Sequence, residues 1–155
     1  MKEPKQDKKS HSKPIFMQKI KTALLSYGMS GKVFHAPFLD LHSGFEITGA
    51  WERSKRLIQS DFPEVKSYAT LEALLQDDCD LVIVNTPVGT HYEYAKQVLL
   101  AGKHAIVEKA FTTTVAEAQE LAALANEKGL QLAVFQNRRW DSDFKTVQKI
   151  LQDKI

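Results

Sequence analysis

The sequence predicts an α/β domain built on a doubly wound parallel sheet of about six strands. Short apolar segments alternate with amphipathic helical segments from Ile20 onward, which is typical of parallel strands joined by crossover helices. Most of the apolar segments are continuous, as in strands that are covered on both faces. The expected strands are residues 20–25, 45–51, 81–85, 104–107 and 131–135, with a short, weaker one at 66–68.

The helices are recognised by the residues at their ends. Residues 90–93 and 114–117 both have the Thr-x-x-Glu pattern of a capping box, whose two side chains bond the free backbone donors of a helix start. Gly102 and Gly129 follow these helices and are expected to supply the left-handed backbone of a C-cap. Further helices are expected at residues 71–75 and 143–151 and after residue 31.

The composition indicates one globular domain. The 155 residues are 43% hydrophobic and 26% charged, and a chain of this length buries enough surface to fold without a disulfide or metal staple. The single cysteine, Cys79, cannot form an internal disulfide, which favours a reducing, cytoplasmic compartment. No run of about 18 apolar residues is present, so a membrane-spanning helix is not expected.

The charge distribution argues against nucleic-acid binding. Residues 1–14 hold five Lys and two acidic residues, which leaves 16 basic and 17 acidic side chains in the rest of the chain. The body therefore lacks the basic surface that binds phosphate backbones. Residues 1–16 are expected to be a disordered leader or tag, because they are too polar to offset their ordering entropy.

A glycine-rich turn follows the first expected strand. Ser26, Gly28 and Gly31 occupy the three glycine positions of a dinucleotide-binding turn, with Ser in the first. In such a turn the backbone at Gly28, Met29 and Ser30 approaches the pyrophosphate. Gly31 would allow the following helix to pack closely on the strand. The turn therefore predicts a dinucleotide site.

The end of the second expected strand bears on the choice of dinucleotide. Glu52 lies 21 residues beyond Gly31, where an acidic side chain accepts hydrogen bonds from the adenosine ribose. Glu52 would repel a 2′-phosphate, which favours NAD, whereas Arg53 and Ser54, with the basic residues after them, could embrace one and favour NADP. We expect NAD(P) as the cofactor, with a lean to NAD.

Polar residues follow three more expected strands at the same edge of the sheet. Ligands of doubly wound sheets bind outside the carboxyl ends of the strands, so these residues are predicted to face the cofactor. Two alternatives stay open, because His91 could be a satisfied histidine near a helix cap and Glu108 with Lys109 could be a solvated ion pair. No metal site is expected. The candidate cofactor residues at this edge are Thr86, Pro87, His91, Glu108, Lys109, Asn137 and Arg138.

Together and in this order, these motifs resemble the N-terminal half of the glucose-fructose oxidoreductase and inositol dehydrogenase family (Gfo/Idh/MocA), over about residues 19–155. Residues 33–38 and 136–144 are most similar to its scyllo-inositol dehydrogenase branch. The resemblance implies a Rossmann dinucleotide-binding domain over residues 17–140 and a linking helix that begins within 141–155. It also implies hydride transfer between a sugar or cyclitol carbon and a nicotinamide.

The resemblance assigns one catalytic candidate. Lys109 matches the family lysine that assists proton transfer at the substrate hydroxyl. Ala110 stands where the family usually has proline, so the backbone constraint that aims the lysine is missing.

Family members continue into an α+β domain that binds substrate and commonly forms a homo-oligomer interface. We expect this domain to be absent from the 155 residues, which would then bind nucleotide but be inactive alone. Non-catalytic sensing of NAD(P) is the alternative function.

The last expected helix carries apolar residues at helical spacing. Trp140, Phe144, Val147 and Leu151 are expected either to form an uncovered apolar face or to pack onto the nucleotide domain. The pattern alone does not choose between these two placements.

Overall fold

Six parallel strands form one sheet in the order β3-β2-β1-β4-β5-β6. The computed structural model describes residues 18–52 and 55–154, so the leader expected at 1–16 and the candidates Arg53 and Ser54 lie outside the described residues. This strand order is that of dinucleotide-binding doubly wound domains, which confirms the predicted fold class, and each expected strand is right to within one residue at either end. The strands are β1 (Ile20–Leu24), β2 (Phe45–Trp51), β3 (Lys66–Tyr68), β4 (Leu81–Val84), β5 (His104–Val107) and β6 (Leu132–Val134).

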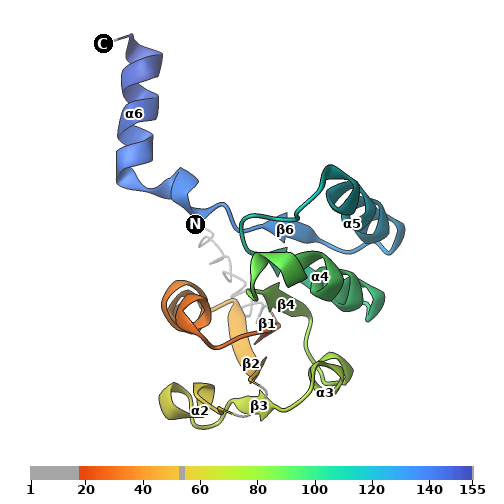
Figure 1. The fold of residues 1–155 in the computed structure, drawn as a ribbon. Helices are drawn as coiled ribbons and strands as arrows, with labels where there is room; N and C mark the ends of the chain where they lie inside the picture. Colours follow the sequence, from red (N-terminus) through yellow and green to blue (C-terminus); the bar gives the residue numbers. More distant parts are fainter. Residues whose placement is uncertain (1–17, 53–54, 155) are drawn as a thin grey trace, which may run out of the picture.

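Helices cover both faces of the sheet (Figure 1). Successive side chains of a strand point to opposite faces, and Ala23 and Leu25 accordingly join one buried cluster while Leu24 joins the other. The first cluster includes residues of α3 (Leu71–Gln76), α4 (His91–Leu100) and α5 (Val115–Glu127). The second includes residues of α1 (Ala36–Leu41) and α2 (Ile58–Asp61).

One of the two expected capping boxes is present. Thr114 Oγ1 accepts a hydrogen bond from Glu117 N, and the Glu117 carboxylate accepts one from Thr114 N, which caps α5 as predicted. The capping box at Thr90 was a wrong prediction. Thr90 lies in a 3₁₀ turn and its hydroxyl bonds Thr86 and Pro87, so it makes no capping bond to α4.

The expected glycine C-caps are confirmed by backbone geometry. Gly102 and Gly129 have φ angles of +75° and +65°, values at which a β-carbon would clash with the neighbouring backbone. Each glycine turns the chain directly into the next strand, β5 or β6. These two turns therefore fix the starting points of the strands whose carboxyl ends carry Glu108 and Asn137.

The last helix, α6 (Ser142–Asp153), projects away from the sheet (Figure 1). None of its residues is buried, and Trp140, Phe144, Val147 and Leu151 are 49% to 74% exposed. Of the two placements that the sequence left open, the structure has the uncovered apolar face. Within residues 18–52 and 55–154, no helix is long and apolar enough to cross a membrane.

Candidate nucleotide-binding site

The turn after β1 packs too tightly for any residue but glycine at position 31. A β-carbon on Gly31 would lie 2.3 Å from the backbone oxygen of Ser26 and 3.0 Å from Asn85 Nδ2. A β-carbon on Gly28 would meet only Ser26 Oγ, at 3.4 Å, and Gly28 lines an open cleft. Position 31 is therefore closed to a side chain, whereas position 28 is open toward the cleft.

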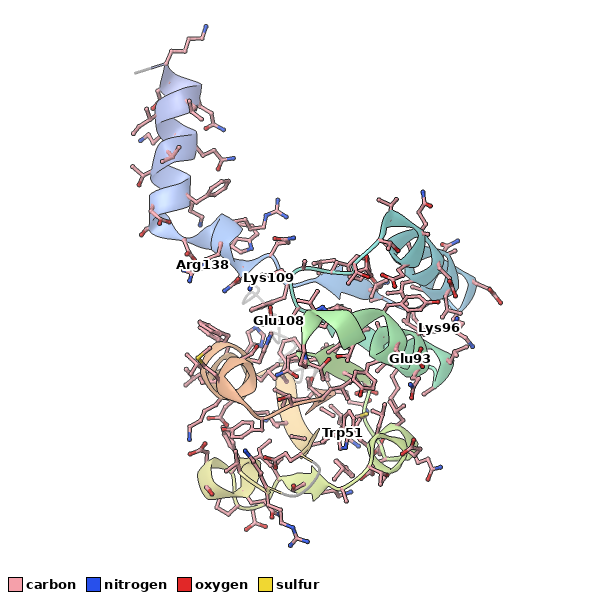
Figure 2. The ribbon with its side chains drawn as sticks, in the orientation of Figure 1. Trp51, Glu93, Lys96, Glu108, Lys109 and Arg138 are labelled. Atoms are coloured by element: carbon pink, nitrogen blue, oxygen red, sulfur yellow. The ribbon has the colours of Figure 1, made fainter. Side chains whose placement is uncertain are left out.

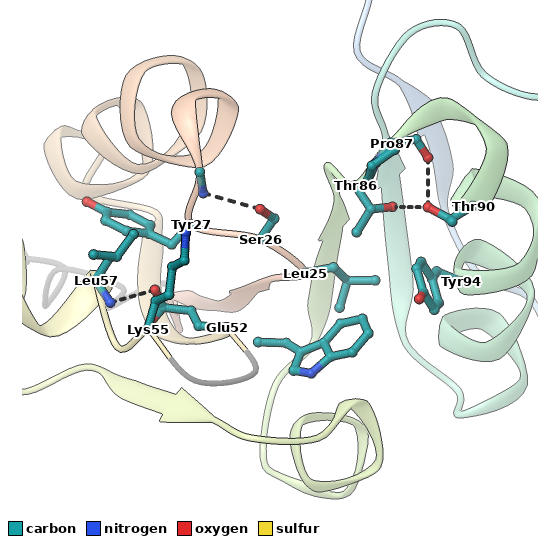
Figure 3. A pocket seen from close by; sticks show the side chains of 12 residues that line it. Leu25, Ser26, Tyr27, Glu52, Lys55, Leu57, Thr86, Pro87, Thr90 and Tyr94 are labelled. Atoms are coloured by element: carbon teal, nitrogen blue, oxygen red, sulfur yellow. Dashed lines mark hydrogen bonds between the residues drawn. The ribbon is translucent and has the colours of Figure 1, made fainter.

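A cleft of about 320 Å³ opens beside this turn, between the ends of β1, β2 and β4 (Figure 3). Of the cofactor candidates, it brings together Gly28, Glu52, Thr86 and Pro87. Its apolar wall includes Trp51 and Tyr94, whose rings meet edge to face with centroids 5.3 Å apart. A flat heterocycle with a polar sugar, such as adenosine, fits a cleft of this composition.

The carboxylate of Glu52 is engaged within the protein. Glu52 Oε1 accepts a hydrogen bond from Leu57 N at 2.7 Å, as Figure 3 shows, and both oxygens lie 3.2 Å from Ile58 N. Oε2 also accepts from Ser67 Oγ at 2.9 Å. Glu52 thus caps the start of α2 and anchors it to β3.

A second hollow, of about 220 Å³, lies on the other side of the glycine turn, at the ends of β5 and β6. Since Gly28 lines the first cleft and the next residue lines the second, the turn separates two halves of one edge. A dinucleotide has the same two-part form, with a pyrophosphate between two nucleosides. The cofactor candidates that line this second hollow are Met29, Ser30, Glu108, Lys109, Asn137 and Arg138.

Glu108 joins the glycine turn to β5. Its Oε1 accepts from Ser30 Oγ at 2.7 Å and lies 3.0 Å from His35 Nε2, while Oε2 accepts from Lys109 N at 3.2 Å. Burial acts to raise the pKa of Glu108, but these hydrogen bonds outweigh it and hold that pKa below the ordinary value. Burial lowers the pKa of His35, so at neutral pH the pair is a carboxylate bonded to a neutral imidazole.

Lys109 is exposed at the rim of the second hollow (Figure 2). Its ammonium has no hydrogen bond or ion pair with any residue that the structure describes. The peptide bond between Lys109 and Ala110 is cis. The Arg138 side chain is 80% exposed, and its Nη1 forms an ion pair with Asp141 Oδ2 at 2.8 Å.

His91 lines neither hollow and is 1% exposed. Its Nδ1 lies 2.8 Å from the carbonyl oxygen of Ala110, and its Nε2 lies 2.7 Å from that of Thr86. The ring therefore links the loop after β4 to the loop after β5. Both ring nitrogens thus lie next to backbone carbonyl oxygens within the fold.

The structure adds site residues that the sequence did not single out. Asn85 is 6% exposed and its Nδ2 donates to Ser26 O at 2.8 Å, which holds the glycine turn against β4. Its Oδ1 is the one buried side-chain oxygen or nitrogen without a hydrogen-bond partner within the described part of the chain. His35, Trp51 and Tyr94 contribute from separate elements. Asn85 at a strand end and Trp51 beside Glu52 had a signal in the sequence, whereas His35 and Tyr94 had none.

No group of three or more His, Cys, Asp or Glu side chains is placed to hold a metal ion among residues 18–52 and 55–154. The polar groups at the carboxyl edge are instead hydroxyls, amides and single charges. These are groups that contact sugars and phosphates.

Known proteins are similar to this chain in sequence and fold. A family model described as an oxidoreductase family with an NAD-binding Rossmann fold, Gfo/Idh/MocA, matches residues 20–136. IolW of Bacillus subtilis, named scyllo-inositol 2-dehydrogenase (NADP(+)), is 41% identical over 135 residues, which cover 86% of this chain and 38% of the relative.

Solved structures agree. An oxidoreductase from Bacteroides fragilis is 49% identical with a TM-score of 0.81, over 88% of this chain and 43% of that one. GenD2 from gentamicin A biosynthesis, solved in complex with NAD, is 29% identical with a TM-score of 0.80, over 87% and 39%. The chain thus spans 38% to 43% of the lengths of these proteins. By family model, identity and fold together, the chain belongs to the Gfo/Idh/MocA oxidoreductase family and carries its NAD-binding Rossmann domain.

Proposed function

We propose that this chain is the nucleotide-binding half of an NAD(P)-dependent oxidoreductase that transfers a hydride between a sugar or cyclitol carbon and the nicotinamide. The observation that carries the proposal is the pair of hollows on either side of the glycine turn, at the carboxyl edge of the sheet. The name of the relative IolW supports the cyclitol class.

Each hollow has its own task in this proposal. The cleft with Thr86 and Pro87 would hold the adenosine half, and the backbone at Gly28 would face the pyrophosphate. The second hollow would hold the nicotinamide half, where such a cofactor supplies the hydride acceptor or donor. Asn137 and Arg138 border this hollow, and Glu108 holds its wall in place through Ser30.

Lys109 is the proposed catalytic residue. Its ammonium, which has no partner among the described residues, lies at the rim of the second hollow, where it would donate to a substrate hydroxyl and move a proton at that oxygen. His91 helps to hold the loop that carries Lys109, because its Nδ1 lies 2.8 Å from the carbonyl oxygen of Ala110. Ala110 is the residue that stands where the family usually has proline.

The proposal extends to the chain as a whole. Residues 17–140 would form the dinucleotide domain, with the link to a substrate-binding part starting within 141–155. The family's commonest partners, a small sugar or cyclitol and a second subunit, would bind through that part. The lone Cys79, buried and reduced, supports a cytoplasmic location.

Dinucleotide binding tests the proposal directly. Titration of the chain with NADH and NADPH should give saturable quenching of intrinsic fluorescence, because Trp51 lines the first cleft. Gly28→Val should abolish binding by filling the cleft, whereas Gly89→Val, whose β-carbon meets nothing within 4 Å, should leave it unchanged. Failure of both dinucleotides to bind at millimolar concentration would overturn the proposal.

A measurement of substrate turnover distinguishes the proposed enzyme from the alternative, a non-catalytic sensor. The 155-residue chain should bind dinucleotide yet oxidise scyllo-inositol slowly or not at all, and a robust rate would contradict its proposed role as one half. Ala110 favours the alternative, a non-catalytic NAD(P) sensor. A sensor would give no turnover even from the complete reading frame, whereas the enzyme would turn over and lose that activity on Lys109→Ala.

A further inference from the structure

A buried histidine lies against the wall of the second hollow. His35 ends the single π-helical turn η1 (Gly31–His35) that follows the glycine turn, a geometry often found at functional sites. It is 3% exposed and is not among the residues that line the hollow. Its ring packs on that of Phe135, which does line the hollow, with centroids 4.3 Å apart. His35 is thus a buried titratable group to which the proposed function gives no task.

The hydrogen bond between His35 and Glu108 has one direction. An ionised carboxylate can only accept hydrogen bonds, and the pKa of Glu108 is held below its ordinary value. Nε2 of His35, which lies 3.0 Å from Glu108 Oε1, therefore carries a proton and donates it to this bond. Burial lowers the pKa of His35, so the ring is neutral at neutral pH and its single N–H faces the carboxylate.

Glu108 connects His35 to two parts of the site. The oxygen that accepts from His35 also accepts from Ser30 Oγ at 2.7 Å, and the other oxygen accepts from Lys109 N at 3.2 Å. Glu108 and Lys109 lie at the same edge of the sheet (Figure 2). Among residues 18–52 and 55–154, no lysine or arginine forms an ion pair with Glu108, so these three donors hold its charge. Of the three, His35 is the one that is buried and fixed by packing.

We infer that His35 is a positioning residue for the nicotinamide half of the site. Through Glu108 it holds the Ser30 end of the glycine turn and the backbone of Lys109 in the arrangement that receives the nicotinamide. The inference rests on the proposed dinucleotide function and adds to it a residue that contacts neither cofactor nor substrate. A purely structural histidine would instead stabilise the whole domain and affect both halves of the site alike.

The two halves of the cofactor provide the test. The ligands are ADP, which has only the adenosine half, and the reduced dinucleotide, NADH or NADPH, whichever binds the chain more tightly. Trp51 in the first cleft is the fluorescent reporter for both. His35→Phe keeps an aromatic ring against Phe135 but has no N–H, so the dinucleotide should bind about tenfold more weakly, as for one lost bond to a charged group. The affinity for ADP should stay that of the wild type.

Two further variants separate the hydrogen bond from the packing of the ring. His35→Gln keeps a neutral N–H donor near the place of Nε2 and should recover most of the affinity for the dinucleotide. His42→Phe makes the same change at an exposed histidine just after α1, whose Nδ1 accepts one hydrogen bond from Gly44 N. This control should alter neither affinity.

A double substitution tests whether His35 acts through Glu108. In a Glu108→Ala background the carboxylate is gone, so His35→Phe should weaken the dinucleotide by much less than tenfold. Nitrogen NMR of the wild-type chain tests the same bond without any variant that must fold. At neutral pH the His35 ring should carry its proton on Nε2, and the signal of this N–H should shift on addition of the dinucleotide but not of ADP.

The outcomes distinguish the inference from the proposed function. Equal losses of ADP and dinucleotide in His35→Phe, no loss of either, or additive effects of the His35 and Glu108 substitutions would overturn the inference and leave dinucleotide binding intact. A proton on Nδ1 alone, or an equal shift of the N–H signal with ADP, would also overturn it. Failure of the wild type to bind either NADH or NADPH would instead overturn the proposed function, and this inference with it.

Discussion

Position 31 is where the nucleotide-binding turn leaves the least room for a side chain. In Gly31→Ala the new β-carbon would lie 2.3 Å from Ser26 O, so the turn must shift away from β4. We expect a loss of about 2 kcal/mol in the free energy of unfolding, the usual scale of overpacking, together with weaker dinucleotide binding. Urea denaturation measures the first effect and fluorescence titration the second.

The matched control for this substitution is Gly89→Ala. A β-carbon there meets nothing within 4 Å, and the change should stay within about 0.5 kcal/mol of the wild type. If the two variants unfold at the same urea concentration, the contact between Gly31 and Ser26 does not constrain the turn.

His91 is a second single residue on which two loops depend. His91→Leu would remove the ring whose nitrogens lie 2.8 Å from the carbonyl oxygen of Ala110 and 2.7 Å from that of Thr86, at a cost of about 2 kcal/mol in unfolding free energy. His91→Gln, which can still donate to one of the two, should lie between. Urea denaturation measures both, and His42→Leu, at an exposed histidine whose Nδ1 accepts one hydrogen bond from Gly44 N, is the comparison. A loss in His91→Leu no larger than that in His42→Leu would mean that the bridge contributes little.

At the scale of elements, a network of charged and polar side chains ties β3 to the end of α3. Asp77 Oδ2 accepts from Lys66 Nζ and Tyr68 Oη, and Asp77 Oδ1 accepts from Asp78 N at 2.7 Å. The bond from Lys66 is the largest cause of a pKa for Asp77 well below its usual range, followed by those from Tyr68 and Asp78. The ionised carboxylate therefore stabilises this edge of the sheet.

This network predicts how stability depends on acid. A carboxyl whose folded pKa is depressed binds its proton more readily in the unfolded chain, so its contribution is complete above the unfolded pKa of about 4. It is then lost as the pH falls through the folded value. Asp77→Asn should be less stable than wild type at pH 6, and the difference should begin to shrink below about pH 4 and go on shrinking as the pH falls further. Urea denaturation across this range checks it, with Asp40→Asn on the exposed side of α1 as the control. A constant difference at every pH would contradict the assignment.

The elements that the sequence predicted well are those whose signal is local. β4 and β5 are short apolar runs between turn residues, and α5 begins at a capping box formed within four residues of the chain. α2 has no such signal, because its start is capped by Glu52, which lies five residues before Leu57. The capping box expected at Thr90 failed for a related reason, since the Thr90 hydroxyl has nearer partners in the preceding turn.

For the molecule as a whole, the doubly wound parallel sheet could be predicted while much of the site could not. The alternation of strands and helices and the turn at Gly28 were enough to place Thr86, Glu108 and Lys109 at one edge. The direction of a side chain at that edge depends on partners far away in the sequence. The hydrogen bond between Ser30 and Glu108 joins residues 78 positions apart, and no spacing in the sequence predicts it.

The placement of α6 has the largest consequence for the whole molecule. Phe144, Val147 and Leu151 follow one another at the spacing of one helical face and are 49%, 54% and 74% exposed. Exposed apolar stripes of this kind favour association with another apolar surface. The second copy of the chain offers the same stripe, and two such helices can bury it by packing against each other.

We therefore expect the 155-residue chain to self-associate reversibly through α6, with a sedimentation coefficient that rises with protein concentration. Val147→Glu would bury an unpaired charge in the contact and should keep the chain monomeric. Lys149→Glu places the same acidic residue on the opposite face of α6 and should leave association unchanged. Both variants should bind dinucleotide as the wild type does, because α6 contributes no residue to the cleft beside the glycine turn. A wild-type chain that remains monomeric at all concentrations, or equal effects of the two variants, would show that the stripe does not mediate contact between copies.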